Sequence, residues 1–189
     1  MTPLQTIILV AVVVAVVVLA GFAWAAYRRR ELRKRFGPEY DRVIADTNNR
    51  AAAERELRDR ERRYASLALR PLLPQSQQRY AAAWSDVQAR FIDSPHQAVD
   101  AADDLVTQLV AECGYPTSDF DDQLATLSVE HATTLGHYRD AHEISLRNQR
   151  GEATTEELRQ ALVHHRALFT ELLGQDPVRV GDPDHKESR

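Results

Sequence analysis

The stretch IILVAVVVAVVVLAGFAWAA, residues 7–26, decides how the rest of the chain is interpreted. It holds no charged residue over 20 positions, and as a helix it would be about 30 Å long at 1.5 Å per residue. That length matches the hydrocarbon thickness of a bilayer. The segment therefore predicts a single N-terminal transmembrane anchor, which we assign to residues 1–27.

Charges on either side of this run predict its orientation. Residues 1–6 carry no charged side chain, whereas residues 28–35 carry six Arg or Lys. A secretory signal usually has a basic start and a shorter apolar core of about 7 to 15 residues. Because basic residues stay on the cytoplasmic side, we expect the N-terminus outside the cell membrane and the C-terminal domain in the cytoplasm. The small-x-small pattern Ala23-Trp24-Ala25 keeps an alternative open, a secreted helical protein cleaved near Ala26.

The residues after the apolar run are expected to contact lipid. Trp and Tyr favour the membrane interface, and anionic headgroups attract juxtamembrane cations by about 1 kcal/mol each. A basic run can also contact nucleic acid, but the remainder of the chain is acidic, so we predict no nucleic-acid partner. The predicted membrane contacts are Trp24, Tyr27, Arg28, Arg29, Arg30, Arg33, Lys34 and Arg35.

Charge divides the chain into a basic stem and an acidic body. Residues 28–70 hold 14 Arg or Lys and 8 Asp or Glu, a net charge of +6. Residues 79–178 hold 7 against 17, a net charge of −10. The single cysteine, Cys113, excludes an internal disulfide and weighs against a cysteine metal cluster, which needs several thiolates.

Residues 28–73 are predicted to form a charged helical stalk. Gly37-Pro38 should break the helix that leaves the membrane and start another. Possible i,i+4 ion pairs follow, and such pairs favour a solvated rod without a core. A coiled coil remains possible from a seven-residue spacing, although Arg50 occupies one of its positions. The possible ion pairs are Glu54/Arg58, Glu56/Arg60 and Asp59/Arg63. The residues at the seven-residue spacing are Val43, Leu57 and Tyr64.

Residues 74–174 are predicted to form a small all-α bundle of four to five helices. Apolar residues recur there at helical spacing, and about 100 residues with four apolar faces can bury a modest core. We expect helix starts at Ser94-Pro95, at Ser118 and at the capping box Thr154-x-x-Glu157. Residues 175–189 have little to bury and are expected to be disordered. The expected apolar faces include Tyr80/Trp84/Val87/Phe91, Ala98/Ala102/Leu105/Leu109, Phe120/Leu124/Leu127, Leu135/Tyr138/Ala141 and Leu158/Leu162/His165/Phe169.

The sequence shows few signals of a catalytic or metal-binding site. The histidines lack the Glu-x-x-His and His-Glu-x-x-His spacings of bundle metal sites. A ligand or metal sensor using His131, His142 and His165 is the alternative hypothesis. Cys113 comes just before a helix-terminating glycine, where the helix dipole raises a thiol pKa. The sequence thus predicts a non-enzymatic interaction or scaffold module, with no cofactor and with an unidentified protein partner.

Several segments resemble a family of uncharacterised helical proteins from high-GC Gram-positive bacteria, often labelled hypothetical or secreted. They are RYAAAWSDVQARFIDSPHQAVDAADDLV (79–106), GYP (114–116), LSVEHATTLGHYRDAH (127–142) and GEATTEELRQALVHHRALFTELL (151–173). The similarity spans about residues 36–173. It implies a common helical domain after an N-terminal span, and it implies no activity, ligand or catalytic residue.

Overall fold

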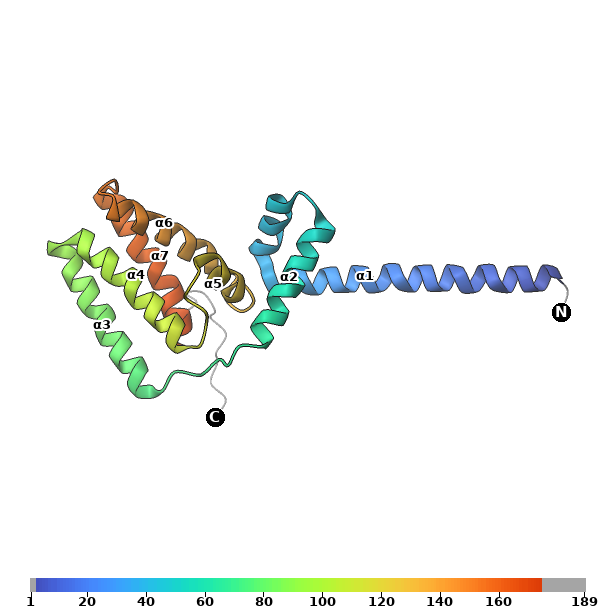
Figure 1. Cartoon of the computed structure of the whole chain (residues 1–189), viewed down its shortest axis with the longest axis horizontal. Helices are drawn as coiled ribbons and strands as arrows, with labels where there is room; N and C mark the ends of the chain where they lie inside the picture. Colours follow the sequence, from blue (N-terminus) through green and yellow to red (C-terminus); the bar gives the residue numbers. More distant parts are fainter. Residues whose placement is uncertain (1–2, 175–189) are drawn as a thin grey trace, which may run out of the picture. The chain divides into compact units, whose positions relative to one another are not determined.

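The computed structural model describes residues 3–174, except for the side chains of residue 4 and residues 6–10. This part of the chain is all-helical, as expected, and it contains seven helices (Figure 1). The predicted disordered tail, residues 175–189, lies outside the described residues. The chain splits into two compact units, Met1–Arg58 and Asp59–Arg189, which divide within α2. The helices are α1 (Pro3–Thr47), α2 (Arg50–Ala65), α3 (Pro74–Asp93), α4 (Pro95–Glu112), α5 (Phe120–Leu127), α6 (Leu135–Gln149) and α7 (Thr155–Leu172).

Two breaks shape the first unit. Gly37 has φ 46° and ψ −124°, a left-handed conformation that glycine adopts at low cost, and Pro38 follows it. The predicted break at Gly37-Pro38 is therefore confirmed as a kink within α1. A second break follows α1, where Asn48 has φ 48°. Asn49 then caps α2, because its side-chain oxygen accepts from the backbone N–H of Ala51 at 3.0 Å.

The predicted stalk is helical over residues 28–47 and 50–65 but not over residues 66–73, and it has a small core rather than being a solvated rod. Leu57 is fully buried, and the small side chain of Ala53 permits close helix packing. Of the expected ion pairs, Glu54 instead accepts from Arg29 at 3.3 Å and from the Tyr40 hydroxyl at 3.1 Å. Sequence spacing could not show this, because the partners belong to two helices. The buried apolar side chains are Leu32, Phe36, Tyr40, Val43, Ala53 and Leu57.

The seven-residue spacing considered for a coiled coil is not continuous in the structure. Val43 lies in α1, whereas Leu57 and Tyr64 lie in α2, and the break at Asn48 separates the two helices. The expected pair Asp59/Arg63 has other partners. Asp59 pairs with Arg62, and Arg63 pairs with Asp122 of the second unit's own α5 at 2.7 Å.

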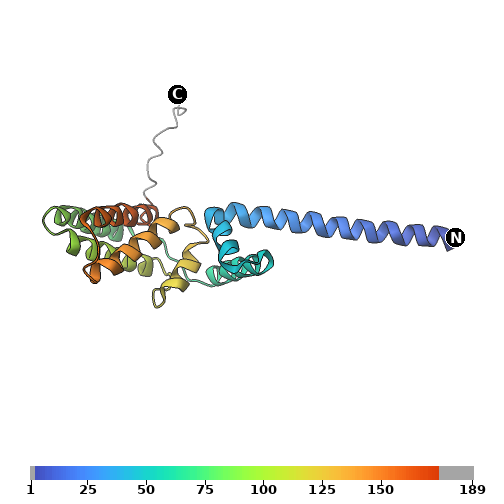
Figure 2. The same ribbon diagram turned by 90° about the horizontal axis from the view of Figure 1, so that it is seen from above.

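The second unit is a bundle of α3, α4, α6 and α7, with the short α5 beside α6 (Figures 1 and 2). α3 and α4 form one hairpin and α6 and α7 another, and α4 packs against both helices of the second hairpin. The rings of Trp84 and Phe169 stack with centroids 4.7 Å apart, which joins α3 to α7. The largest part of the core comprises Tyr80, Trp84, Val87, Leu105, Val106, Leu109, Leu127, Leu135, Tyr138, Leu168 and Phe169.

The helix starts follow the sequence signals only in part. The capping box is confirmed, because Glu157 N–H donates to the Thr154 hydroxyl and Thr154 N–H donates to the Glu157 carboxylate. Ser94 precedes Pro95 at the start of α4, but its side chain makes no capping hydrogen bond. α5 is capped by Asp119 rather than by Ser118, through the backbone N–H of Asp122.

Gly114 ends α4 as expected and also fixes the segment that precedes α3. Its φ is +95°, and a Cβ added there would lie 2.8 Å from the carbonyl oxygen of Ala68. The backbone N–H of Arg70 donates to the carbonyl of Cys113 at 3.0 Å. Only glycine allows the backbone of residues 68–70 to pack this closely on the end of α4.

Candidate functional site

The apolar part of α1 is exposed wherever its side chains are described. Residues 11–30 are all exposed, and their exposed fractions reach 67% at Leu19 and 73% at Phe22. The helix is long and apolar enough to cross a membrane, and none of its most apolar window is buried within the protein. Core helices of soluble proteins bury such side chains, so the described part of this apolar segment does not belong to a protein core.

The predicted lipid-contacting residues lie at the end of the apolar segment and just beyond it, on the same helix. Trp24 and Tyr27 are 60% and 65% exposed, and the Arg28 guanidinium lies 4.2 Å from the centre of the Trp24 ring. We call residues 28–35 the basic collar.

The collar has two faces. Arg29 and Arg33 flank the packed face of α1 and pair with Glu54 and Asp41, both at 3.3 Å. Arg30 and Lys34 are exposed, and the helical rotation of 100° per residue places them on the opposite side. Arg35 is also exposed. The collar therefore contributes both to the fold of the first unit and to its exposed charge.

The three histidines proposed from the sequence are not gathered at one site. His142 Nδ1 lies 3.3 Å from Asp103 Oδ1, and His165 Nε2 lies 3.5 Å from the same oxygen. His131 instead contacts Glu171, with Nδ1 2.8 Å from the carboxylate. The structure thus brings two of the three to a shared carboxylate, and it gives the third a different partner.

The buried group around His165 has the composition of a catalytic triad without its geometry. Ser145 Oγ and Asp103 both approach the same nitrogen, Nε2 of His165, at 3.2 and 3.5 Å. A hydrolase triad needs the serine and the carboxylate on opposite ring nitrogens, but His165 Nδ1 has no hydrogen-bond partner among the described atoms. Burial lowers the pKa of His165 to about 4, while Asp103 opposes this shift. The ring is therefore neutral near pH 7 and has a structural role.

A second polar group lies at the other end of the α6–α7 hairpin. The Tyr115 hydroxyl is 3.2 Å from His131 Nε2, and Thr134 donates to Glu171 at 2.5 Å. Burial raises the pKa of Glu171, but the hydrogen bonds from His131 and Thr134 outweigh it and leave this pKa lowered. A cavity of about 280 Å³ is lined by Tyr115, His131, Glu171 and the buried Cys113, among others.

Cys113 has little nucleophilic character. Burial, followed by the nearby charge of Glu112, raises its thiol pKa to about 11. The direction agrees with the sequence argument, but the main physical cause is burial rather than the helix dipole. A neutral thiol attacks poorly, since the thiolate is the nucleophile.

A third histidine group was not recognised as a metal-binding group from the sequence. His137 and Asp140 of α6 and His164 of α7 place one potential ligand atom each within 4.8 Å of one another. We call these three residues the outer cluster. The signal that could have found it is His137-x-x-Asp140, an i,i+3 pair on one helical face, combined with the antiparallel pairing of α6 and α7.

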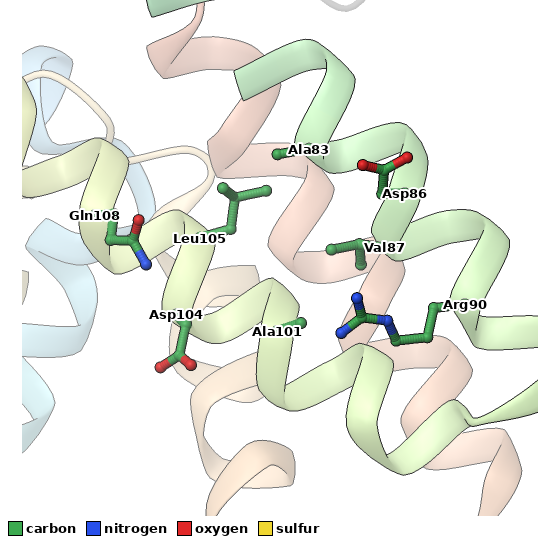
Figure 3. A pocket seen from close by; sticks show the side chains of 8 residues that line it. All are labelled: Ala83, Asp86, Val87, Arg90, Ala101, Asp104, Leu105 and Gln108. Atoms are coloured by element: carbon green, nitrogen blue, oxygen red, sulfur yellow. The ribbon is translucent and has the colours of Figure 1, made fainter. Parts of the chain in front are cut away.

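A shallow groove runs between α3 and α4 (Figure 3). Its volume is about 290 Å³, at the lower limit for small-molecule sites. Val87 and Leu105 lie between the helices, while Asp86, Arg90 and Asp104 line the edges.

Comparison with known proteins finds no matching family model, no similar curated protein and no similar solved structure. The resemblance drawn from the sequence therefore stays a prediction. The features that bear on function are the exposed apolar part of α1, the basic collar and the helical bundle.

Proposed function

We propose that this chain is a single-pass membrane protein whose bundle is tethered on the cytoplasmic side as a non-enzymatic interaction module. The observation that carries the proposal is the exposed aliphatic surface of α1, followed directly by the basic collar. In water this surface would be unfavourable, at about 25 cal/mol per Å² of apolar area. A bilayer removes that cost.

The collar supports the orientation. Six cations follow the apolar segment and none precedes it, which retains the C-terminal side in the cytoplasm. Trp24 and Tyr27 then lie at the inner interface, and the exposed Arg30 and Lys34 interact with anionic headgroups. Arg29 and Arg33 contribute less to lipid contact, because Glu54 and Asp41 already neutralise them.

The bundle supports a binding role rather than catalysis. Its Ser145–His165–Asp103 group lacks the arrangement of a proton relay, and its thiol is buried. The net charge of −10 over residues 79–178 favours a partner that presents positive charge. We therefore expect a cationic protein segment as the partner. Cross-linking in intact cells that recovers no protein with this bundle would argue strongly against a binding role.

Topology is the decisive test. A reporter that is active only in the cytoplasm, fused after Arg189, should be active, and an export-dependent reporter at the same position should be silent. The full chain should resist alkaline extraction from membranes. Replacing all six collar cations by Gln should produce a mixed or inverted orientation, whereas replacing Arg42, Arg50 and Arg55 should not.

The opposite result has a definite meaning. Export of the C-terminal reporter, with a mature N-terminus near Ala26 by protein sequencing, would identify the chain as a secreted helical protein. Export without cleavage would leave the anchor in place but reverse the orientation and the compartment of the partner.

A further inference from the structure

We propose that His137, Asp140 and His164 form a binding site for one divalent transition-metal ion, with Zn²⁺ as the probe. The inference is independent of the membrane orientation proposed above, because all three residues belong to the α6–α7 hairpin. It also differs from the metal hypothesis drawn from the sequence, since none of its residues is His131, His142 or His165.

The geometry assembles the ligands from two helices. Asp140 lies one helical turn after His137 on α6, and His164 faces them from α7. The two imidazole rings are 4.8 Å apart between centroids, with 48° between their planes. All three potential ligand atoms lie within 4.8 Å of one another. Two nitrogens and one carboxylate oxygen are a ligand set that zinc uses where three protein groups leave a position open.

Small side-chain rotations bring these atoms to binding distance. Zinc–ligand bonds of about 2.0 to 2.1 Å in a tetrahedron place ligand atoms about 3.3 Å apart. His137 and Asp140 are exposed, so rotation about their side-chain bonds meets little obstruction. The helices themselves are held in place, because neighbouring Tyr138 and His165 are buried in the bundle. Rigid elements that carry adjustable side chains are suitable supports for a metal site.

His164 provides an independent indication. Its Nδ1 atom is buried and has no hydrogen-bond partner among the described residues, an arrangement that is unfavourable for a buried polar atom. The corresponding nitrogens of His131 and His142 already contact Glu171 and Asp103. The outer cluster thus contains an imidazole nitrogen that the protein leaves unsatisfied, and coordination through that atom would remove the deficit.

Binding has a structural consequence beyond occupancy. The ion would cross-link α6 to α7, and a ligand that binds only the folded state raises stability by mass action. The fourth position would hold water or a group from another molecule. Zn²⁺ binding therefore has two readouts. One is isothermal titration, and the other is the Zn²⁺-dependent shift in the unfolding temperature of the bundle.

The test uses the full chain in detergent, without a polyhistidine tag. Zn²⁺ titration should give one ion per chain and raise the unfolding temperature, whereas Mg²⁺, which prefers oxygen ligands, should do neither. His137→Ala, His164→Ala and Asp140→Asn should each weaken Zn²⁺ binding more than about tenfold, since even outer-shell changes cost 10- to 100-fold. Glu143→Gln, an exposed carboxylate on α6 outside the outer cluster, should bind as the parent chain does.

Two results would overturn the site. One is a parent chain that takes up no stoichiometric Zn²⁺. The other is a His137→Ala/His164→Ala double variant that keeps the parent affinity, which would place the ion on other histidines. Replacing the partly buried His164 could also disturb the fold. His137 is exposed, so His137→Ala should stay folded and separates loss of a ligand from loss of structure. X-ray absorption at the zinc edge should count two imidazole ligands in the parent and fewer in each histidine variant.

Discussion

At the scale of single residues, two glycines of the bundle differ in what their backbones require. Gly114 has a left-handed backbone and lies against the carbonyl of Ala68, whereas Gly136 lies within α6 with nothing within 4 Å of an added Cβ. The first glycine is therefore needed for close packing. The second has only the entropic cost of glycine in a helix.

Opposite effects are expected from alanine at these two sites. Gly114→Ala should destabilise the bundle by about 1–3 kcal/mol through backbone strain and the close contact. Gly136→Ala should stabilise it by up to about 1 kcal/mol. Denaturant unfolding can be followed by Trp84 fluorescence in a Trp24→Phe background, which leaves one tryptophan. Equal effects at both sites would contradict the assignment.

Stability should depend on pH through His165. Its pKa is lowered to about 4 from 6.5, mainly by burial. Between these values the unfolded chain binds a proton that the folded chain does not, so stability falls as pH drops from about 6.5 to about 4. The loss is on the order of 3 kcal/mol. Asp103 of α4 opposes the pKa shift, while His142 of α6 and His164 of α7 add to it.

The measurement is the unfolding free energy at several pH values in the same single-tryptophan background. His165→Gln removes the titrating group and should flatten this part of the profile, whatever its effect on absolute stability. A variant that keeps the full slope between pH 6.5 and 4 would show that another group titrates.

At the scale of elements, the start of α7 is the best-specified helix end in the bundle. Thr154 and Glu157 satisfy each other's backbone N–H groups, and Arg147 of α6 contacts Glu157 at 2.5 Å. Hydrogen bonds from the Thr154 backbone and side chain, then from Arg147, lower the pKa of Glu157 to about 2. This carboxylate therefore stays ionised across the physiological range.

Thr154→Ala should cost about 1 kcal/mol, the usual loss for an N-cap hydroxyl. The matched control is Thr155→Ala, the next residue, which is exposed and lies in the first turn of the helix. That change should stay within about 0.5 kcal/mol. Urea unfolding of both variants checks the difference, and a control as destabilised as Thr154→Ala would contradict the cap.

Local elements were more predictable than the contacts between them. Proline at helix starts, Gly37-Pro38 and Thr154-x-x-Glu157 act within a few residues, so the sequence locates the bundle helices and the kink. Ser118 and Asp119 can both cap a helix, and only the backbone geometry selects Asp119. The contact of Glu54 with Tyr40 and the proximity of His164 to Asp140 both depend on the register between two helices. No local spacing encodes that register, which is why the core of the stalk was missed and the outer cluster was not recognised as a metal-binding group.

At the scale of the whole molecule, the proposed membrane integration relies on the apolar side chains of residues 7–26. Twelve Ile, Leu, Val and Phe residues lie there, and together they favour insertion by about 4–7 kcal/mol at 0.3 to 0.6 each. The exposure of the described part of this segment is consistent with lipid as its surroundings.

Arginine at Val13, Val16 and Val17 should prevent integration. Three central arginines cost about 8–10 kcal/mol on the same insertion scale, which exceeds the total favourable contribution. The triple variant should appear in the alkaline-extractable or aggregated fraction after membrane fractionation. Leucine at the same three positions is the matched control and should remain integrated. Retention of the arginine variant in the membrane fraction would contradict the assignment of this span.

The stack of Trp84 on Phe169 also has a consequence for biosynthesis. The α3–α4 and α6–α7 hairpins join neighbouring segments, so each can form soon after it is made, since local contacts form fastest. The stack instead joins residues 85 positions apart, and α7 is the last described helix to emerge from the ribosome. Until then the apolar faces of α3 and α4 lack part of their cover. A nascent chain stalled before Thr155 would therefore expose a surface that chaperones recognise.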